Sequence, residues 1–279
     1  MARLDSLNIL LDTTGKMKLA EAYKGVIENV QKNAISSQIK NTDLSGNPET
    51  GTVEAKRFVN ATSKSYGTAR SAGAGDAVEG KPVTIAIDTD KEFVEEVEEK
   101  DASLLGVNGL ISRRSKNHAL RMTAELDAAF FAEGKSAGTE FTPAVGTTAI
   151  NAIVEEAILT LETLSNDYID GIDRDMMSIT FDAETYSAMR NYLDTVNNSN
   201  VKTDAEQFNR FHGVKCFSSN RLPSGTKFEI MMDGSIAQPV RSKAYGAERI
   251  PLSNAMGITL FFSYGTKAVT PETILYYAP

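Results

Sequence analysis

Residues 51–88 constrain the fold strongly, because two extended segments are joined there by a polar tract rich in glycine, serine and alanine. The first extended segment covers residues 52–60, and the second alternates apolar residues at Val83, Ile85 and Ile87. This pattern predicts two β-strands with a flexible tip between them. An isolated two-stranded ribbon is at best marginally stable in water, so we expect another surface to cover it.

The glycines of this tract raise the question of a phosphate-binding loop. Such a loop holds its glycines in a tight turn that opens a helix, where backbone amides face the phosphate. Here Pro82 and an alternating strand follow, and the spacing in GAGDAVEG matches neither G-x-G-x-x-G nor G-x-x-x-x-G-K-[ST]. The sequence therefore argues against a nucleotide site and favours a polar loop tip that includes Gly73 and Gly75.

Length and composition describe an ordinary globular chain. Its 279 residues are enough for one large domain or two modest ones, and 41% of them are hydrophobic. The net charge of -8 disfavours a general nucleic-acid binder. The single cysteine, Cys216, fits a reducing compartment and a packing role, and no apolar run approaches the length of a membrane span. We therefore expect a protein made in the cytoplasm.

The remaining patterns predict a mixed α+β fold without a regular βαβ series. We expect an amphipathic helix at 17–40 that acts as a hinged arm, followed by a flexible joint that ends near residue 51. Further helices are predicted at 92–99, 104–133, 149–165 and 182–194, the last with Asp182 as its N-cap. Strands are predicted at 176–181, in short segments across 213–240, and in the aromatic tail 257–279.

No residue pattern argues for catalysis, so we expect no enzyme activity, no cofactor and no metal. His118 and His212 lie in neither of the common zinc-binding helix motifs, and no serine sits in a nucleophile elbow. The best metal candidates are the aspartates at 167, 170, 173 and 175, but they lack the order of an EF-hand loop. An acidic turn between a helix and a strand explains them better.

The order of these elements resembles the major capsid proteins of tailed bacteriophages, which have the Hong Kong 97-type fold. The similarity rests on the succession of KPVTIAIDTDKEFVEEVEEKDA before the long helix, then MMSITFDAETYSAM, GVKCFSSNRLP and AERIPLSNAMGITLFFSYGTKAVTPETI. The resemblance covers nearly the whole chain. It implies a shell protein that self-assembles around double-stranded DNA.

By this resemblance the chain divides into an N-terminal arm (1–44), an extended loop (45–88), a peripheral domain with a long spine helix (89–146 and 236–279) and an axial domain (147–235). The extended loop would reach over an adjacent subunit, and its glycine tip would adapt to non-identical shell positions. The residues expected at intersubunit contacts are Lys56, Arg57, Phe58, Tyr66, Arg70, Gly73, Gly75, Glu92, Glu95, Glu96, Arg113 and Arg114.

The resemblance also implies the partners. They are further copies of the chain as pentamers and hexamers, a separate scaffolding protein, a portal, decoration proteins, and packaged DNA bound without sequence specificity. No membrane is expected, and no motif supports the lysine-to-asparagine cross-link of some relatives. Two alternatives remain open: an encapsulin-like compartment around cargo enzymes, and a soluble metal-dependent enzyme that uses the aspartates at 167–175.

Overall fold

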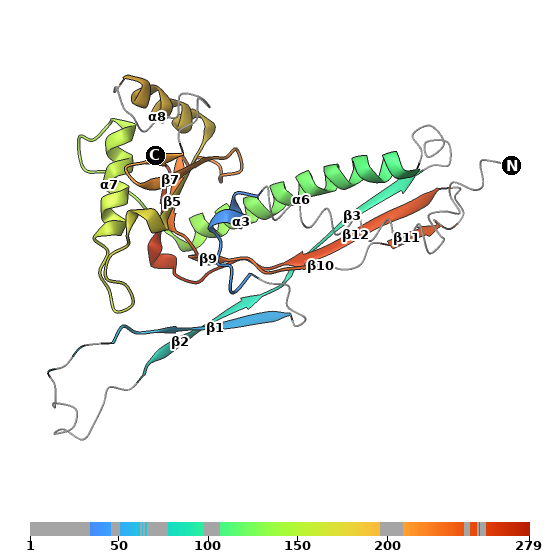
Figure 1. Cartoon of the computed structure of the whole chain (residues 1–279), viewed down its shortest axis with the longest axis horizontal. Coiled ribbons are helices and arrows are strands. Elements are labelled where there is room, and N and C mark those ends of the chain that lie inside the picture. The colour runs from blue at the N-terminus through green and yellow to red at the C-terminus, as the bar shows by residue number, and fades with distance from the viewer. Residues whose placement is uncertain are drawn as a thin grey trace. The chain divides into compact units, whose positions relative to one another are not determined.

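The computed structural model describes residues 34–45, 51–61, 63, 65, 78–97, 107–195, 209–242, 246–249, 251 and 255–279. Helices and strands alternate irregularly, in agreement with the predicted α+β class (Figure 1). The chain divides into two compact units. One comprises the described parts of 1–51, 86–130 and 238–266, and the other those of 52–85, 131–237 and 267–279. None of the helices within these described ranges has both the length and the apolar composition needed to cross a bilayer.

The first unit is built on an antiparallel sheet whose central strand is β12 (Met256–Tyr264). Strand β3 (Thr89–Val97) pairs with β12 along its whole length, with Thr89 opposite Tyr264 and Val97 opposite Met256 (Figure 1). Strands β10 (Val240–Ser242) and β11 (Gly246–Arg249) pair with the two ends of β12. They therefore occupy the edge of β12 that β3 leaves free.

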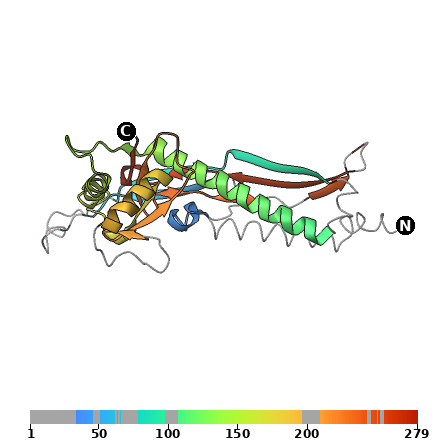
Figure 2. The same cartoon turned by 90° about the horizontal axis from the view of Figure 1, so that it is seen from above.

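The long helix predicted at 104–133 is present as α6 (Val107–Ala137), which is continuous over 31 residues (Figure 2). At about 1.5 Å per residue this corresponds to a helix of about 46 Å. One face of its middle part packs on the sheet of the first unit. The buried residues of this small core are Ala119, Met122, Leu126, Leu260, Phe262 and Tyr264.

The helix predicted at 92–99 is wrong, because residues 89–97 form strand β3. The apolar residues Phe93, Val94 and Val97 and the surrounding glutamates suit a helix by local propensity. Pairing with β12 over nine residues outweighs that preference, since a tertiary ladder satisfies every second backbone group of the segment. The period of two is also visible in the side chains, because Phe93 is half-buried while Val94 is 55% exposed.

A short helix, α3 (Ser36–Ile39), is the described part of the arm that was predicted at 17–40; the other residues of that arm lie outside the described ranges. Its first turn is fixed by the fully buried carboxylate of Asp127 on α6. This carboxylate accepts hydrogen bonds from the Ser36 amide (3.0 Å) and the Ser36 hydroxyl (2.7 Å). A negative charge at a helix N-terminus is favourable, so α3 is anchored to the long helix.

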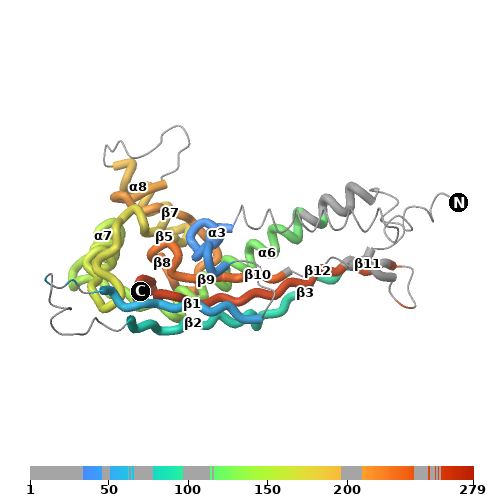
Figure 3. Tube along the Cα trace, turned by 60° about the horizontal axis from the view of Figure 1, so that its bottom comes forward, coloured from blue at the N-terminus to red at the C-terminus, as the bar shows by residue number. Residues whose placement is uncertain are grey.

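The predicted ribbon is confirmed as a two-stranded sheet of β1 (Thr52–Phe58) and β2 (Gly80–Ala86), which lie side by side in Figure 3. In β1 the side chains alternate between half-buried and exposed positions. Its tip at 66–77, with Gly73 and Gly75, lies outside the described residues.

The second unit is built on a six-stranded mixed sheet in the order β4-β14-β8-β5-β7-β6. Its strands are β4 (Thr139–Glu140), β5 (Met177–Phe181), β6 (Arg210–Phe211), β7 (Val214–Ser218), β8 (Phe228–Met232) and β14 (Ile274–Tyr277). A separate two-stranded sheet joins β9 (Ile236–Ala237) to β13 (Lys267–Ala268). Two 3-10 turns, η1 (Arg174–Met176) and η2 (Pro271–Thr273), precede β5 and β14.

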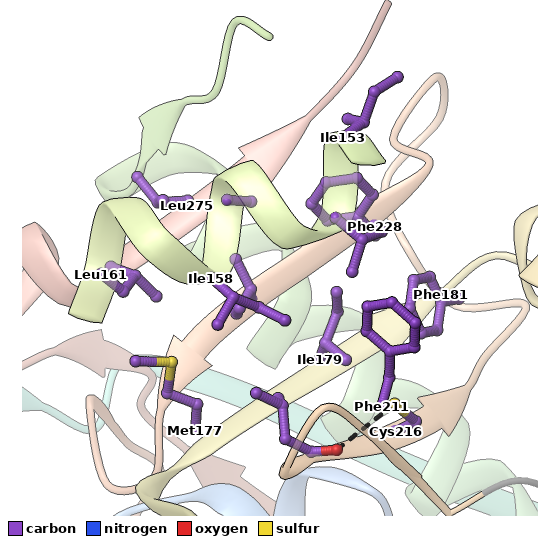
Figure 4. Packing of buried hydrophobic residues seen from close by; sticks show 14 of the residues in the cluster. Ile153, Ile158, Leu161, Met177, Ile179, Phe181, Phe211, Cys216, Phe228 and Leu275 are labelled. Carbon is purple, nitrogen blue, oxygen red and sulfur yellow. Dashed lines mark hydrogen bonds between the residues drawn. The ribbon is translucent and has the colours of Figure 1, made fainter. Parts of the chain in front are cut away.

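Helices α7 (Ile150–Glu162) and α8 (Ala183–Thr195) contribute buried residues to the core of this sheet. Figure 4 shows Ile158 and Leu161 of α7 near Ile179 and Met177 of β5. The N-cap prediction is confirmed, because the carboxylate of Asp182 accepts a hydrogen bond from the third residue of α8 (2.7 Å). The strand predicted at 176–181 is β5, and all five of its residues are buried.

Candidate assembly surfaces

Arg57, predicted as an intersubunit residue, is engaged within its own chain. Its guanidinium forms an ion pair with Glu272 of η2 and lies 4.1 Å from the centroid of the Tyr168 ring. Burial would raise the pKa of Glu272, but hydrogen bonding and charge from Arg57 outweigh it and lower that pKa. Close by, the Asn60 amide donates to the backbone carbonyl of Asp167 (2.9 Å). These contacts hold the tip-side end of β1 on its own unit.

The two other predicted contact residues on β1 are exposed. Lys56 and Phe58 project from the outer face of β1, and the Phe58 side chain is 55% exposed. Val59 and Val78, next to the ribbon strands, are 39% and 82% exposed. Apolar side chains at this density on a thin ribbon are typical of a surface that associates with another molecule.

Strand β3 separates its acidic residues onto two faces. Glu92 and Glu96 lie on the exposed face, with Val94 between them. Glu95 points the other way, toward α6, where it forms an ion pair with Arg114 and lies 3.3 Å from Nε2 of His118. Glu92 and Glu96 are therefore accessible to a partner, whereas Glu95 and Arg114 already neutralise each other inside the unit.

His118 belongs to this internal cluster and is a packing residue. Its side chain is almost fully buried, and its ring stacks on Phe93 with the centroids 5.3 Å apart. Burial, together with the nearby charge of Arg114, lowers the pKa of His118. The cluster thus stabilises the contact between β3 and α6 and offers no free acid or base.

The remaining predicted contact residues cannot be placed. Tyr66, Arg70, Gly73 and Gly75 lie outside the described residues, and Arg113 belongs to α6 but its side chain lies outside them too. The exposed face of β3 was not predicted from the sequence, because residues 92–99 were assigned to a helix. The alternation of Lys91, Phe93 and Glu95 with Glu92, Val94 and Glu96 is the signal that could have revealed it.

The remaining candidate sites are the aspartates at 167–175 and Cys216, and both lie in structural parts of the second unit. The aspartates at 167–175 lie in the connection between α7 and β5, as predicted, and within the described ranges no group of three histidine, cysteine or acidic residues is arranged to hold a metal ion. Arg174 in this connection forms ion pairs with Glu155 and Glu162 of α7 (2.9 and 2.8 Å). Cys216 is buried in the core, and burial raises its pKa to about 12.

No protein-family model and no curated protein sequence matches the chain. Solved structures do match along most of its length. A structure of Mycobacterium phage Che8 is 19% identical with a TM-score of 0.62, covering 82% of this chain and 85% of that chain. A capsid structure of the cyanophage P-SCSP1u is 11% identical with a TM-score of 0.66, covering 86% of each chain.

A virus-like particle from Pyrococcus furiosus is also similar, with 12% identity, a TM-score of 0.59, and coverage of 94% of this chain and 98% of that chain. The chain therefore has the fold of tailed-phage capsid proteins, the Hong Kong 97-type fold, as its sequence suggested. The same fold occurs in the Pyrococcus particle.

Proposed function

We propose that the chain is the major capsid protein of a tailed phage, which self-assembles into an icosahedral shell around double-stranded DNA. The observation that carries this proposal is the similarity to phage capsid structures over more than four fifths of the chain. The ribbon supports it independently, since a thin two-stranded sheet with exposed apolar residues gains stability by lying on a neighbouring copy.

The proposal assigns roles to the parts of the chain. Residues 1–44 act as the arm, 45–88 as the extended loop over a neighbour, 89–146 and 236–279 as the peripheral domain, and 147–235 as the axial domain near the symmetry axes. Lys56, Phe58, Glu92 and Glu96 belong to intersubunit contacts, because their side chains are exposed. Arg57, Glu95 and Arg114 support these surfaces from within one chain.

In this role the protein is a structural component of the virion, made in the host cytoplasm, and not an enzyme. Its partners are its own copies as pentamers and hexamers, a separate scaffolding protein, a portal and decoration proteins. The net charge of -8 suits a container that encloses DNA without gripping it.

Electron microscopy of the purified protein, alone and with any co-encoded scaffold, tests the proposal. We expect shells, or rings of five or six subunits. A compact monomer under every condition would overturn the proposal. Proline substitutions at Gly73 and Gly75 provide a second test, since a stiffened tip should impair closed-shell assembly.

A protein compartment around cargo enzymes is the second candidate, and the similarity to the virus-like particle from Pyrococcus furiosus favours it. Shells isolated from the native host distinguish the two functions. Packaged double-stranded DNA supports the phage head, whereas a co-purifying enzyme inside DNA-free shells supports the compartment.

A further inference from the structure

Strand β3 has a free hydrogen-bonding edge within the described part of the chain, because β12 is its one partner there. The Gly265 amide donates to the carbonyl of Pro239 on the β10 side (3.1 Å). Since neighbouring residues of an antiparallel strand bond in opposite directions, Tyr264 bonds toward Thr89 of β3. The same alternation turns the even-numbered residues of β3 toward the free edge. These residues are Asp90, Glu92, Val94 and Glu96.

Strand β1 has a matching edge, since β2 is its one strand partner among the described residues. The Val59 amide donates to Glu79 (3.2 Å) and the Ile87 amide donates to Gly51 (2.9 Å), so odd-numbered residues bond between β1 and β2. Even-numbered residues therefore point outward, and the outward bond of Asn60 to Asp167 agrees with this assignment. The residues of β1 whose outward backbone groups carry the argument are Glu54, Lys56 and Phe58.

The outer edge of β2 differs from these two edges. Pro82 is an even-numbered residue and carries no amide hydrogen, so it lies at the outward side of β2 and removes a donor there. Proline on an edge strand is a common protection against pairing with another chain. The edges of β1 and β3 have no such protection within 52–58 and 89–97.

We propose that β1 of one copy adds to the free edge of β3 of a neighbouring copy as an antiparallel strand. This inference rests on the proposed shell function, and it defines how the extended loop is bound there. Each edge offers three outward residues over five positions, 54–58 and 90–94, which span about 17 Å at about 3.3 Å per residue. Main-chain hydrogen bonds from added strands are a common mode of recognition.

Charge selects both the partner and the register. Strand β3 carries four acidic residues and one lysine, whereas β1 carries Lys56 and Arg57 against one glutamate. Pairing β3 with another β3 would therefore place acidic residues together. When Lys56 lies opposite Glu92, Glu54 lies opposite Val94. A shift of two residues in either direction places Glu54 opposite Glu92 or Glu96, where like charges repel.

One like-charged pair remains in this register, since Arg57 lies opposite Lys91. Both residues are already neutralised within their own chains. Arg57 is paired with Glu272, and the ammonium of Lys91 lies 2.9 Å from the carboxylate of Glu125. The repulsion between Arg57 and Lys91 is therefore reduced. The pair of Lys56 and Glu92 on the exposed face decides the register.

Disulfide trapping tests the register directly. Directly opposite residues of a hydrogen-bonded antiparallel pair have Cα atoms about 5.5 Å apart, within the range that a disulfide can bridge. We expect the double variant Lys56→Cys/Glu92→Cys to form covalent oligomers when assembled particles are oxidised with copper phenanthroline. The matched control Lys56→Cys/Glu96→Cys displaces one thiol by four residues, about 13 Å, and should remain monomeric on denaturing gels. The buried Cys216 is present in both variants.

A charge exchange provides a second test that does not depend on thiols. Lys56→Glu and Glu92→Lys should each reduce the yield of particles, and the double variant Lys56→Glu/Glu92→Lys should recover it. Two results together would overturn the strand pairing and leave the shell function intact. In the first, particles of Lys56→Cys/Glu92→Cys assemble normally and form no cross-links. In the second, the double variant Lys56→Glu/Glu92→Lys recovers no yield of particles relative to the single variants. Failure of the unmodified chain to assemble at all would overturn both the strand pairing and the shell function.

Discussion

Replacement of Glu229 by glutamine should change how the stability of the subunit depends on pH. Glu229 lies on β8, is fully buried, and has no hydrogen-bond partner for either carboxyl oxygen among the described residues. The carboxyl lies against α6, where a Cβ added to Gly134 would be 2.5 Å from Oε2. Burial raises the pKa of Glu229 well above its ordinary value, and the charge of Lys135 offsets only part of this effect.

The direction of the effect follows from proton binding. An unfolded glutamate has a pKa of about 4.3, so between this value and the pKa of the folded state the native protein binds one proton more than the unfolded chain. Stability therefore falls as the pH rises through this window, by about 1.4 kcal/mol for each pH unit from this one group. Glu229→Gln removes this titrating group. The unfolding free energy of the variant minus that of the wild type should therefore increase by about 1.4 kcal/mol for each pH unit within this window.

Urea denaturation of the unassembled subunit at several pH values above 5 measures the difference in unfolding free energy. Subtracting the two curves cancels every other titrating group that the substitution leaves unchanged. Glu140→Gln is the matched control, since Glu140 is exposed on β4 of the same sheet, and its difference from the wild type should stay flat. A Glu229→Gln difference that is equally flat would show that the carboxyl is ionised in the folded state, and the reasoning would fail.

Three further substitutions test single contacts. Asp127→Ala removes the carboxylate that caps α3, and should lower the unfolding free energy by about 2–4 kcal/mol in the same urea assay, since hydrogen bonds to charged groups are among the stronger ones. Gly265→Ala places a Cβ against the backbone carbonyl of Ala86 and should prevent soluble folding, whereas Gly51→Ala, which meets no atom within 4 Å, should be soluble. Arg57→Ala removes the ion pair and the ring contact at the tip-side end of β1, so proteolysis of the unassembled ribbon should be faster than in Lys56→Ala.

Local patterns predicted the elements that carry their own signal. The alternation at Val83 and Ile85 produced the ribbon, and the apolar spacing of 149–165 produced α7. Asp182 was recognisable as an N-cap, because a cap acts within three residues of its own position. The resemblance to phage capsid proteins came from the order of these elements, and the order is a property of the sequence.

What the sequence could not decide depends on residues far apart along the chain. Residues 89–97 became a strand because β12, more than 150 positions later, supplies a complete ladder, and this ladder outweighs a local preference for helix. Asp127 reads as one more acidic residue of a charged helix until its carboxylate is seen to cap α3, which begins 91 residues earlier. Sequence alone thus determined those elements that carry a local signal, whereas tertiary structure decided the type of segment 89–97 and which edges and charges are left free, because burial and pairing are properties of the packed chain.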